Sequence, residues 1–335
     1  MLILSCTYLN AQNLIAVEHN GVSVFYSTLD SAVNAAQTGD NVYVPGGIFT
    51  LNVSISKGFN LIGVGYNPDS TLATGFTQIT SPSNFVRIIT GADNGSITGI
   101  MFNNNTIIFG TGNSDQTVSN YTVSKCRMSS LQLGYGQGSA TSNNLIFKEN
   151  IFDGNLNGLN IQNCHFSNNM IQLSIYNFQQ GNEFTDNVFL YPSTYILNAV
   201  NNSVFRNNIF LYSNGIFTNL SSNNIFYNNL FVANMSSGSL PGTDVGSLFN
   251  VAQSSIFINQ VGNTYDYHQN YHLKSTCPGK NYGTDGTDLG VYGSATPWKE
   301  GGVPYNPHIQ FQSIATQTDG SGNLSINIKV AAQKN

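Results

Sequence analysis

The central part of the chain repeats a short pattern of apolar and polar positions about every 20 residues. Each copy has an apolar run that ends in phenylalanine, an asparagine three positions later, and a second apolar run. The phenylalanines are Phe147, Phe166, Phe184, Phe205 and Phe226, separated by 19, 18, 21 and 21 residues. Weaker copies begin at Ile97, Val123 and Phe257. A period this short, with strand-length apolar runs, predicts a solenoid with one coil per repeat.

The residue types favour strands over helices in these coils. The apolar runs are rich in β-branched and aromatic residues, and Asn-Asn pairs and glycines interrupt them. Leucine-rich repeats have a similar length, but their Leu-x-x-Leu-x-Leu frame is absent. We therefore predict an all-β parallel β-helix.

The asparagines of the repeat are predicted to form a ladder. Coils of a β-helix stack about 4.8 Å apart, so equivalent residues lie above one another. The phenylalanines would stack inside, and the asparagines would stack at a bend, where each amide can both donate to and accept from its neighbours. Asparagine also tolerates the left-handed backbone of a sharp bend. Exposed loop asparagines without order would not keep phase with the phenylalanines. The predicted ladder comprises Asn150, Asn169, Asn187, Asn208 and Asn229.

Both ends of the solenoid have candidate covering elements. Residues 27–40 read as a short amphipathic helix with a capping box formed by Ser27 and Asp30, and this helix would cover the exposed strand edges. Residues 308–315 and 324–331 alternate in polarity around a turn sequence. They predict a β-hairpin, which either caps the C-terminal end or forms an appended tail.

Three stretches resemble pectate-lyase-like, right-handed parallel β-helix proteins of the secreted bacterial type. These are LDSAVNAAQTGDNVYVPGGIF from Leu29, GFNLIGVGYN from Gly58, and NYHLKSTCPGKNYGTDGTDLGVYG from Asn270, which resembles a closing coil. The resemblance implies a right-handed β-helix and matches no catalytic motif. We divide the chain into a signal-peptide remnant (1–12), an N-terminal cap with a short helix (13–40), the β-helix (41–298), and a C-terminal hairpin or tail (299–335).

The first residues and the composition bear on localisation and partners. Residues 1–12 resemble the end of a signal peptide cleaved after Gln12, or a lipoprotein box with Cys6 lipidated; an ordinary buried strand is the remaining alternative. We expect a secreted protein, either extracellular or on the outer cell surface. Only 8% of residues are charged, the net charge is -5, and no basic cluster occurs, which disfavours nucleic acid as a partner. No apolar run reaches the length of a membrane span.

Candidate catalytic chemistry is sparse. The resemblance implies that a lyase would need clustered carboxylates for calcium and a basic residue, and that a hydrolase would need neighbouring aspartates. The third strand segments of the repeats carry no acids, so we assign no catalytic residues. The fallback candidates are Glu149, Asp153, Asp186 and Arg206. We interpret them as solvated surface charges beside the bend, and Glu149 and Asp186, two coils apart, are too distant for a retaining pair of carboxylates.

No cofactor is expected, although the sequence leaves calcium open. The weak candidate ligands are Asp285 and Asp288 in TDGTD, whose spacing ordinary turn chemistry explains equally well.

The function expected from these features is that of a non-catalytic surface or matrix protein. Its partners would be polysaccharides or surface proteins, with Tyr176, Tyr195 and Asn160 as candidate binding residues, because aromatic faces suit the apolar faces of sugars. The alternative is a divergent polysaccharide lyase or glycoside hydrolase. The oligomeric state stays open.

Overall fold

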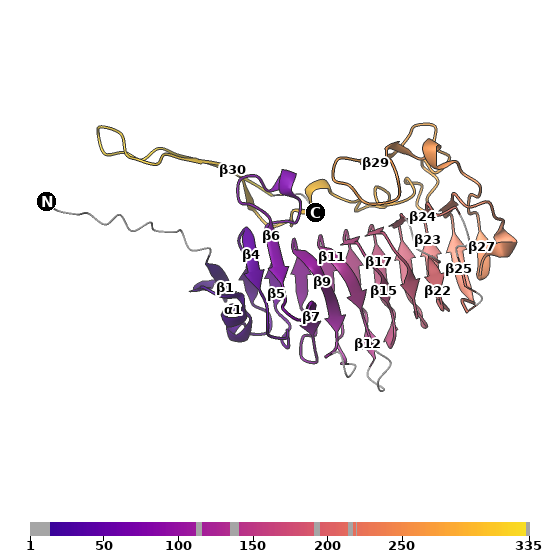
Figure 1. Ribbon diagram of the computed structural model, residues 1–335, viewed down its shortest axis with the longest axis horizontal. Helices are drawn as coiled ribbons and strands as arrows, with labels where there is room; N and C mark the ends of the chain where they lie inside the picture. Colours follow the sequence, from indigo (N-terminus) through magenta and orange to yellow (C-terminus); the bar gives the residue numbers. More distant parts are fainter. Residues whose placement is uncertain are drawn as a thin grey trace.

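The computed structural model describes residues 14–111, 116–134, 141–190, 195–213, 217–218 and 220–332. This part of the chain forms a right-handed parallel β-helix of about 9 turns, with coils stacked along one long axis (Figure 1). The predicted fold class is therefore confirmed. The interpretation of residues 1–12 and of Cys6 concerns residues outside the described ranges.

One face of the solenoid is a sheet that has 12 strands among the described residues. Its first two strands are antiparallel, and the strands from β3 onward are parallel. In sheet order from the N-terminal edge it comprises β2 (Val22–Tyr26), β1 (Ile15–His19), β3 (Asn41–Tyr43), β5 (Asn60–Ile62), β8 (Ser96–Thr98), β10 (Thr122–Ser124), β13 (Ile146–Lys148), β17 (His165–Ser167), β20 (Glu183–Thr185), β23 (Val204–Arg206), β25 (Asn224–Tyr227) and β27 (Gly242–Val245).

The other strands of the coils form a second sheet, which has 13 described strands in two stacks. The long strands β9 and β11 contribute to both stacks, so they join them. The sheet comprises β4 (Gly47–Thr50), β6 (Thr77–Thr80), β7 (Phe85–Ile88), β9 (Met101–Phe109), β11 (Arg127–Gln132), β14 (Ile151–Phe152), β15 (Leu156–Asn157), β18 (Met170–Ile171), β19 (Ile175–Tyr176), β21 (Val188–Phe189), β22 (Leu197–Asn198), β24 (Ile209–Phe210) and β26 (Leu230–Phe231).

The remaining elements are short. A pair of strands, β12 (Ser142–Asn143) and β16 (Ile161–Gln162), lies between the two sheets in the coil path, and β28 (Phe257–Asn259) pairs with β29 (Asn270–Leu273) outside the coils. The 3-10 helices are η1 (Pro68–Ser70), η2 (Ser237–Ser239), η3 (Gln253–Ser255) and η4 (Glu300–Gly302). None of the helices described has the length and apolar content of a membrane-spanning segment.

The repeated phenylalanines form the core in the register that the sequence pattern implies. Phe147, Phe166, Phe184, Phe205 and Phe226 are direct partners across neighbouring strands of the first sheet. Successive rings are stacked with centroids 4.7 to 5.1 Å apart and are almost completely buried. This spacing matches the distance between hydrogen-bonded strands, so ring stacking and strand pairing support the same register.

A helix and an antiparallel hairpin cover the N-terminal end. Helix α1 (Leu29–Ala35) lies within the predicted range, but its N-cap is Thr28, whose Oγ1 accepts a hydrogen bond from the Ser31 backbone, rather than Ser27. The Asp30 carboxylate instead accepts hydrogen bonds from Asn52 in the first coil. The helix packs against β1, β2 and β4. It therefore contacts the first coil and the two strands that extend the sheet beyond it.

The chain after the last coil returns along the side of the solenoid. The last strand of the first sheet ends at Val245, and within the described ranges parallel pairing of the coils continues only as a bridge between Leu230 and Leu248. Residues 277–305, here called the return segment, run back toward the N-terminal end (Figure 1). The stretch from Asn270 is thus not a closing coil, and the solenoid ends well before residue 298. The glycines of the return segment allow its backbone to pack closely against the turns of the coils, and they do not form a further strand.

The predicted C-terminal hairpin is present. Strands β30 (His308–Ile314) and β31 (Ile326–Ala331) pair antiparallel. They extend away from the coils near the N-terminal half of the solenoid (Figure 1), with exposed apolar side chains such as Phe311 and Ile328. The hairpin is therefore an appended element and does not cap the C-terminal end.

Candidate functional site

The five repeat asparagines form a continuous hydrogen-bonded ladder inside the bend. All five are fully buried. Each side-chain amide of the first four donates to the Oδ1 of the next asparagine over 2.9 to 3.1 Å, and that Oδ1 also accepts from the backbone N–H of the donor residue. The second amide proton is donated to a backbone carbonyl of the preceding coil. The ladder asparagines thus use their side-chain amides to hold the coils together, and they are not available to a ligand.

The left-handed residue of each bend is the one before the ladder asparagine, not the asparagine itself. These residues directly follow the strands of the first sheet and have φ between 48° and 79°. We call them the turn row: Gly99, Lys125, Glu149, Asn168, Asp186, Asn207, Asn228 and Gly246. Glycine and asparagine suit this conformation, whereas lysine, glutamate and aspartate there need compensation from other contacts.

The return segment runs along the turn row and forms hydrogen bonds with several of its residues. Asn228 donates to the carbonyl of Tyr282, Asn207 accepts from the backbone N–H of Thr284, and Asn168 donates to the carbonyl of Val291. The order of contacts along the return segment is opposite to the order of the coils. The segment therefore lies antiparallel to the direction in which the coils succeed one another.

Glu149 is not a solvated surface charge. Only 1% of it is exposed, and its carboxylate lies 2.7 Å from the Lys125 ammonium. It also accepts hydrogen bonds from the Lys299 backbone and the Tyr305 hydroxyl of the return segment. The return segment removes this carboxylate from water, which is why the sequence interpretation as a surface charge is wrong.

Asp186 is also buried, with 2% of its surface exposed. Burial raises the pKa of its carboxyl to about 7, partly opposed by a hydrogen bond from Asn207. One carboxylate oxygen has no hydrogen-bond partner within the described part of the chain. Gly293 of the return segment packs against this oxygen. The sequence interpretation of Asp186 as a solvated charge is therefore wrong. Its buried site favours the protonated form of the carboxyl more than water does.

Asp153 and Arg206 are engaged in separate ion pairs. Asp153 receives two hydrogen bonds from Arg127, at 2.8 and 3.1 Å. Arg206 lies 3.5 Å from Glu183 and over the ring of Tyr227. The fallback candidates thus sit in different local networks, and the structure does not bring them together as one constellation.

The predicted glycan-binding residues lie in or next to three short strands, β16, β19 and β22. Tyr176 is half-buried on β19, where it pairs with Asn157 and Asn198 on the neighbouring strands. Tyr195 is exposed, and Asn160 has a left-handed backbone in the turn before β16. These residues lie on different segments of the coils, and none of them lines the pockets described below.

The calcium candidates are occupied by turn and ion-pair contacts. Asp285 accepts hydrogen bonds from the backbone and hydroxyl of Thr287, and Asp288 lies 2.6 Å from the Lys280 ammonium. Among the described residues, no three His, Cys, Asp or Glu side chains gather in a way that could hold a metal ion.

The strongest candidate site is a pocket between the solenoid and the chain that follows the last coil. It has a volume of about 270 Å³, and we call it the aromatic pocket. Five of its lining residues carry large aromatic rings: Tyr265, Tyr267, Tyr271, Tyr292 and Trp298. The tyrosines come from the loop between β28 and β29, from β29 itself and from the return segment, and Met170 of β18 lies at the solenoid wall.

Ring contacts and hydrogen bonds hold this pocket in shape. Tyr265 stacks on Tyr271 with centroids 5.6 Å apart and meets Tyr267 edge-on at 5.4 Å. Gln172 of the solenoid accepts a hydrogen bond from the Tyr265 backbone and donates to Asp153. Arg127 lies over the ring of Tyr267, 5.1 Å from its centroid. The coils therefore anchor the tyrosine loop through an existing ion pair.

Polar groups line the mouth and one wall of the same pocket. Asp69 of η1 is largely exposed, and Glu300 of η4 accepts a hydrogen bond from the Tyr292 hydroxyl. Burial raises the pKa of Tyr271 to about 12 and also raises that of Tyr292. The phenols consequently stay neutral near pH 7, as hydrogen-bonding groups on apolar rings.

Close glycine packing sets the distance between the two 3-10 helices at the pocket. A side chain at Gly301 would collide with Ser70, and one at Gly302 would overlap the ring of Tyr66. Both glycines have positive φ. The return segment can approach the loop around η1 this closely only because no Cβ intervenes.

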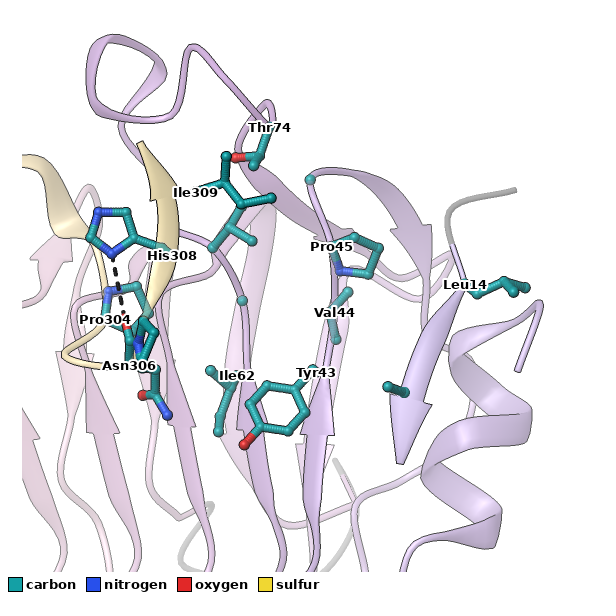
Figure 2. A pocket seen from close by; sticks show the side chains of 15 residues that line it. Leu14, Tyr43, Val44, Pro45, Ile62, Thr74, Pro304, Asn306, His308 and Ile309 are labelled. Carbon is teal, nitrogen blue, oxygen red and sulfur yellow. Dashed lines mark hydrogen bonds between the residues drawn. The ribbon is translucent and has the colours of Figure 1, made fainter. Parts of the chain in front are cut away.

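A second hollow, of about 390 Å³, lies beside the N-terminal coils and is mainly hydrocarbon. Figure 2 shows Tyr43, Val44, Ile62 and Ile309 around it, together with prolines from β3–β4 and from the chain leading into the hairpin. We call it the apolar pocket. Among its described lining residues, Tyr43 is the only one with a six-membered aromatic ring, and few polar groups converge there. It is therefore less suited to a sugar than the aromatic pocket.

The aromatic pocket was not predicted from the sequence, although the sequence contains a signal for it. Three tyrosines fall within the seven residues from Tyr265 to Tyr271. Their partners, Asp69 and Trp298, are remote in sequence and meet the loop only because the chain turns back. A scan against protein-family models matches no family, and a search of curated proteins finds no match to the chain.

Proposed function

We propose that this protein is a non-catalytic, exported β-helix protein that binds glycans through the aromatic pocket. The proposal keeps the function class expected from the sequence but moves its binding site away from Tyr176 and Tyr195. The pectate-lyase-like resemblance of the N-terminal stretches supports a surface or extracellular setting, and it remains part of the proposal.

The observation that carries this function is the gathering of five aromatic rings around a pocket with polar groups at its rim. Aromatic faces pack against the C–H faces of sugar rings, while phenols, amides and carboxylates bond the hydroxyl groups. The volume of about 270 Å³ lies just below the range typical of drug-sized ligands, so it suits one sugar unit of a longer chain.

The lone tryptophan gives a direct test. The chain contains a single Trp, and Trp298 lines the aromatic pocket. Titration with oligosaccharides of glucan, xylan, mannan, chitin and chitosan should change Trp298 fluorescence for at least one glycan. Tyr267→Ala should abolish this binding, because it removes a ring from the pocket wall. Tyr176→Ala, outside the pocket, is the matched control.

The reverse pattern would place the site elsewhere. If Tyr176→Ala abolishes binding measured by calorimetry while Tyr267→Ala does not, the face around β19 is the binding surface. If none of these glycans binds the unmodified protein, the glycan-binding proposal is wrong.

A divergent lyase or hydrolase is the second candidate. It is favoured by one observation, that two carboxylates, Asp69 and Glu300, line the same pocket. Glycoside hydrolysis needs two such groups. Release of reducing ends or unsaturated products that disappears in Asp69→Asn and Glu300→Gln would overturn the non-catalytic proposal.

A further inference from the structure

We infer that the aromatic pocket receives a positively charged group, and that its glycan ligand carries protonated amino sugars. This inference rests on the proposed glycan-binding function and specifies the ligand class.

The charges that line the pocket are negative. Asp69 and Glu300 are its ionisable carboxyl groups, and none of the described lining residues is a lysine or an arginine. An acidic polysaccharide would bring further carboxylates toward these two groups. Like charges repel one another, so an acidic ligand is disfavoured.

The basic groups nearby are directed elsewhere. Arg127 donates two hydrogen bonds to Asp153, and the carboxylate of Asp153 balances the positive charge of the guanidinium. Lys299, adjacent to Trp298 in the chain, places its ammonium 4.4 Å from the centroid of the Tyr305 ring. Neither cation is therefore free to compensate the carboxylates of the pocket.

One histidine faces the carboxylate at the rim. His268 is 80% exposed; its Nδ1 lies 2.9 Å from Asp266 and its Nε2 lies 3.8 Å from Asp69. When neutral, it leaves the charge of Asp69 in place. When protonated, it would compete with a cationic ligand for the same carboxylate.

The aromatic rings add a second attraction for a cation. The faces of tyrosine and tryptophan rings carry negative potential, and a cation held over several such faces is bound by each of them. The protein already uses this contact in the wall of the pocket, where Arg127 lies over Tyr267. An ammonium group on a sugar ring combines this charge with the apolar C–H face that the rings also accept. A protonated amino sugar thus matches both the carboxylates and the rings.

The test compares a cationic, a neutral and an anionic tetramer, of which the first two share the glucosamine backbone. At pH about 6, where an amino sugar is protonated and phenols are neutral, and in a His268→Gln background that removes the competing histidine, the glucosamine tetramer should bind about tenfold more tightly than the N-acetylglucosamine tetramer, as expected from about 1–2 kcal/mol of cation attraction. The galacturonate tetramer should bind more weakly than either. Trp298 fluorescence and calorimetry report the affinities.

Two variants assign the preference to the carboxylates. Asp69→Asn and Glu300→Gln remove negative charge and retain hydrogen-bonding groups. Each should reduce the preference for the charged tetramer over the N-acetylated one, and the double variant should abolish that preference. Tyr176→Ala should leave the preference unchanged.

A small probe separates this inference from the proposed function. Tetramethylammonium should perturb Trp298 fluorescence, and its uncharged analogue neopentyl alcohol should do so much less. If glycans bind but charge makes no difference to either pair of ligands, the inference is wrong and the glycan-binding function stands. If the ammonium probe binds and no glycan does, the pocket selects cations and the glycan ligand is refuted.

Discussion

The Lys125 ammonium and the Glu149 carboxylate lie 2.7 Å apart, and each side chain is only 1% exposed. They occupy successive positions of the turn row, one coil apart, beneath the return segment. Burial lowers the pKa of Lys125, and the Glu149 charge opposes this shift. Lys125 therefore depends on the Glu149 carboxylate to stay charged.

We expect Glu149→Gln to destabilise the fold by about 3–5 kcal/mol, because it leaves the Lys125 charge buried without a counter-charge. Urea unfolding at neutral pH measures the loss. The double variant Lys125→Met/Glu149→Gln should recover a large part of the lost stability. Equal losses in the single and double variants would show that the charge pairing is not the cause.

A second prediction concerns the ladder. Asn187→Ala removes the acceptor for Asn169 and the donor to Asn208, so buried amide groups lose partners. Such groups cost about 1–3 kcal/mol each when unsatisfied. The control is Asn34→Ala on the exposed face of α1, which should leave the melting temperature unchanged or slightly raised. Similar behaviour of the two variants would argue against the ladder as a source of stability.

The pH dependence of stability should report Asp186. Its folded-state pKa is raised to about 7, whereas an unfolded aspartate titrates near 4. Between these values the folded state binds more protons than the unfolded state, so the contribution of Asp186 to stability falls as pH rises. The total loss is at most about 4 kcal/mol, from about three pKa units.

Asp186→Asn tests this titration. Asparagine already occupies the neighbouring turn-row positions 168 and 207, so the backbone tolerates it. The variant should have nearly normal stability near pH 4 and should exceed the unmodified protein near pH 8, as measured by urea unfolding at both pH values. A stability difference that is the same at both would rule out a raised pKa at this carboxyl.

The C-terminal hairpin should be dispensable for the stability of the coils. Most of its residues are exposed, and a hydrogen bond from Gln312 to the Ala73 carbonyl links it to the loop after η1. Truncation after Asn306 should leave the thermal midpoint of the solenoid nearly unchanged. Truncation after Thr276, which also removes the return segment, should lower it markedly by exposing the turn row. Equal effects of the two truncations would contradict this division.

The repeat made the coils predictable, because ring stacking and amide pairing act between neighbouring coils at a fixed distance. Phe166 and Asn169, for example, meet partners that the sequence places one period away. The course of the return segment had no such signal. Its contacts join residues such as Asn168 and Val291, which share no periodicity, so Glu149 and Asp186 were wrongly expected to face solvent. The aromatic pocket depends on the same long-range contact and was missed for the same reason.

The return segment has a consequence for the order of folding. In a simple solenoid each coil contacts only its neighbours, so coils can form in succession and also open in succession from the ends. Here residues near position 300 contact coils more than a hundred residues earlier, as between Lys299 and Glu149. The early coils cannot complete their native contacts until the C-terminal third of the chain has been synthesised. We therefore expect the rod to complete its native contacts slowly and late in folding. We also expect it to unfold as one cooperative unit.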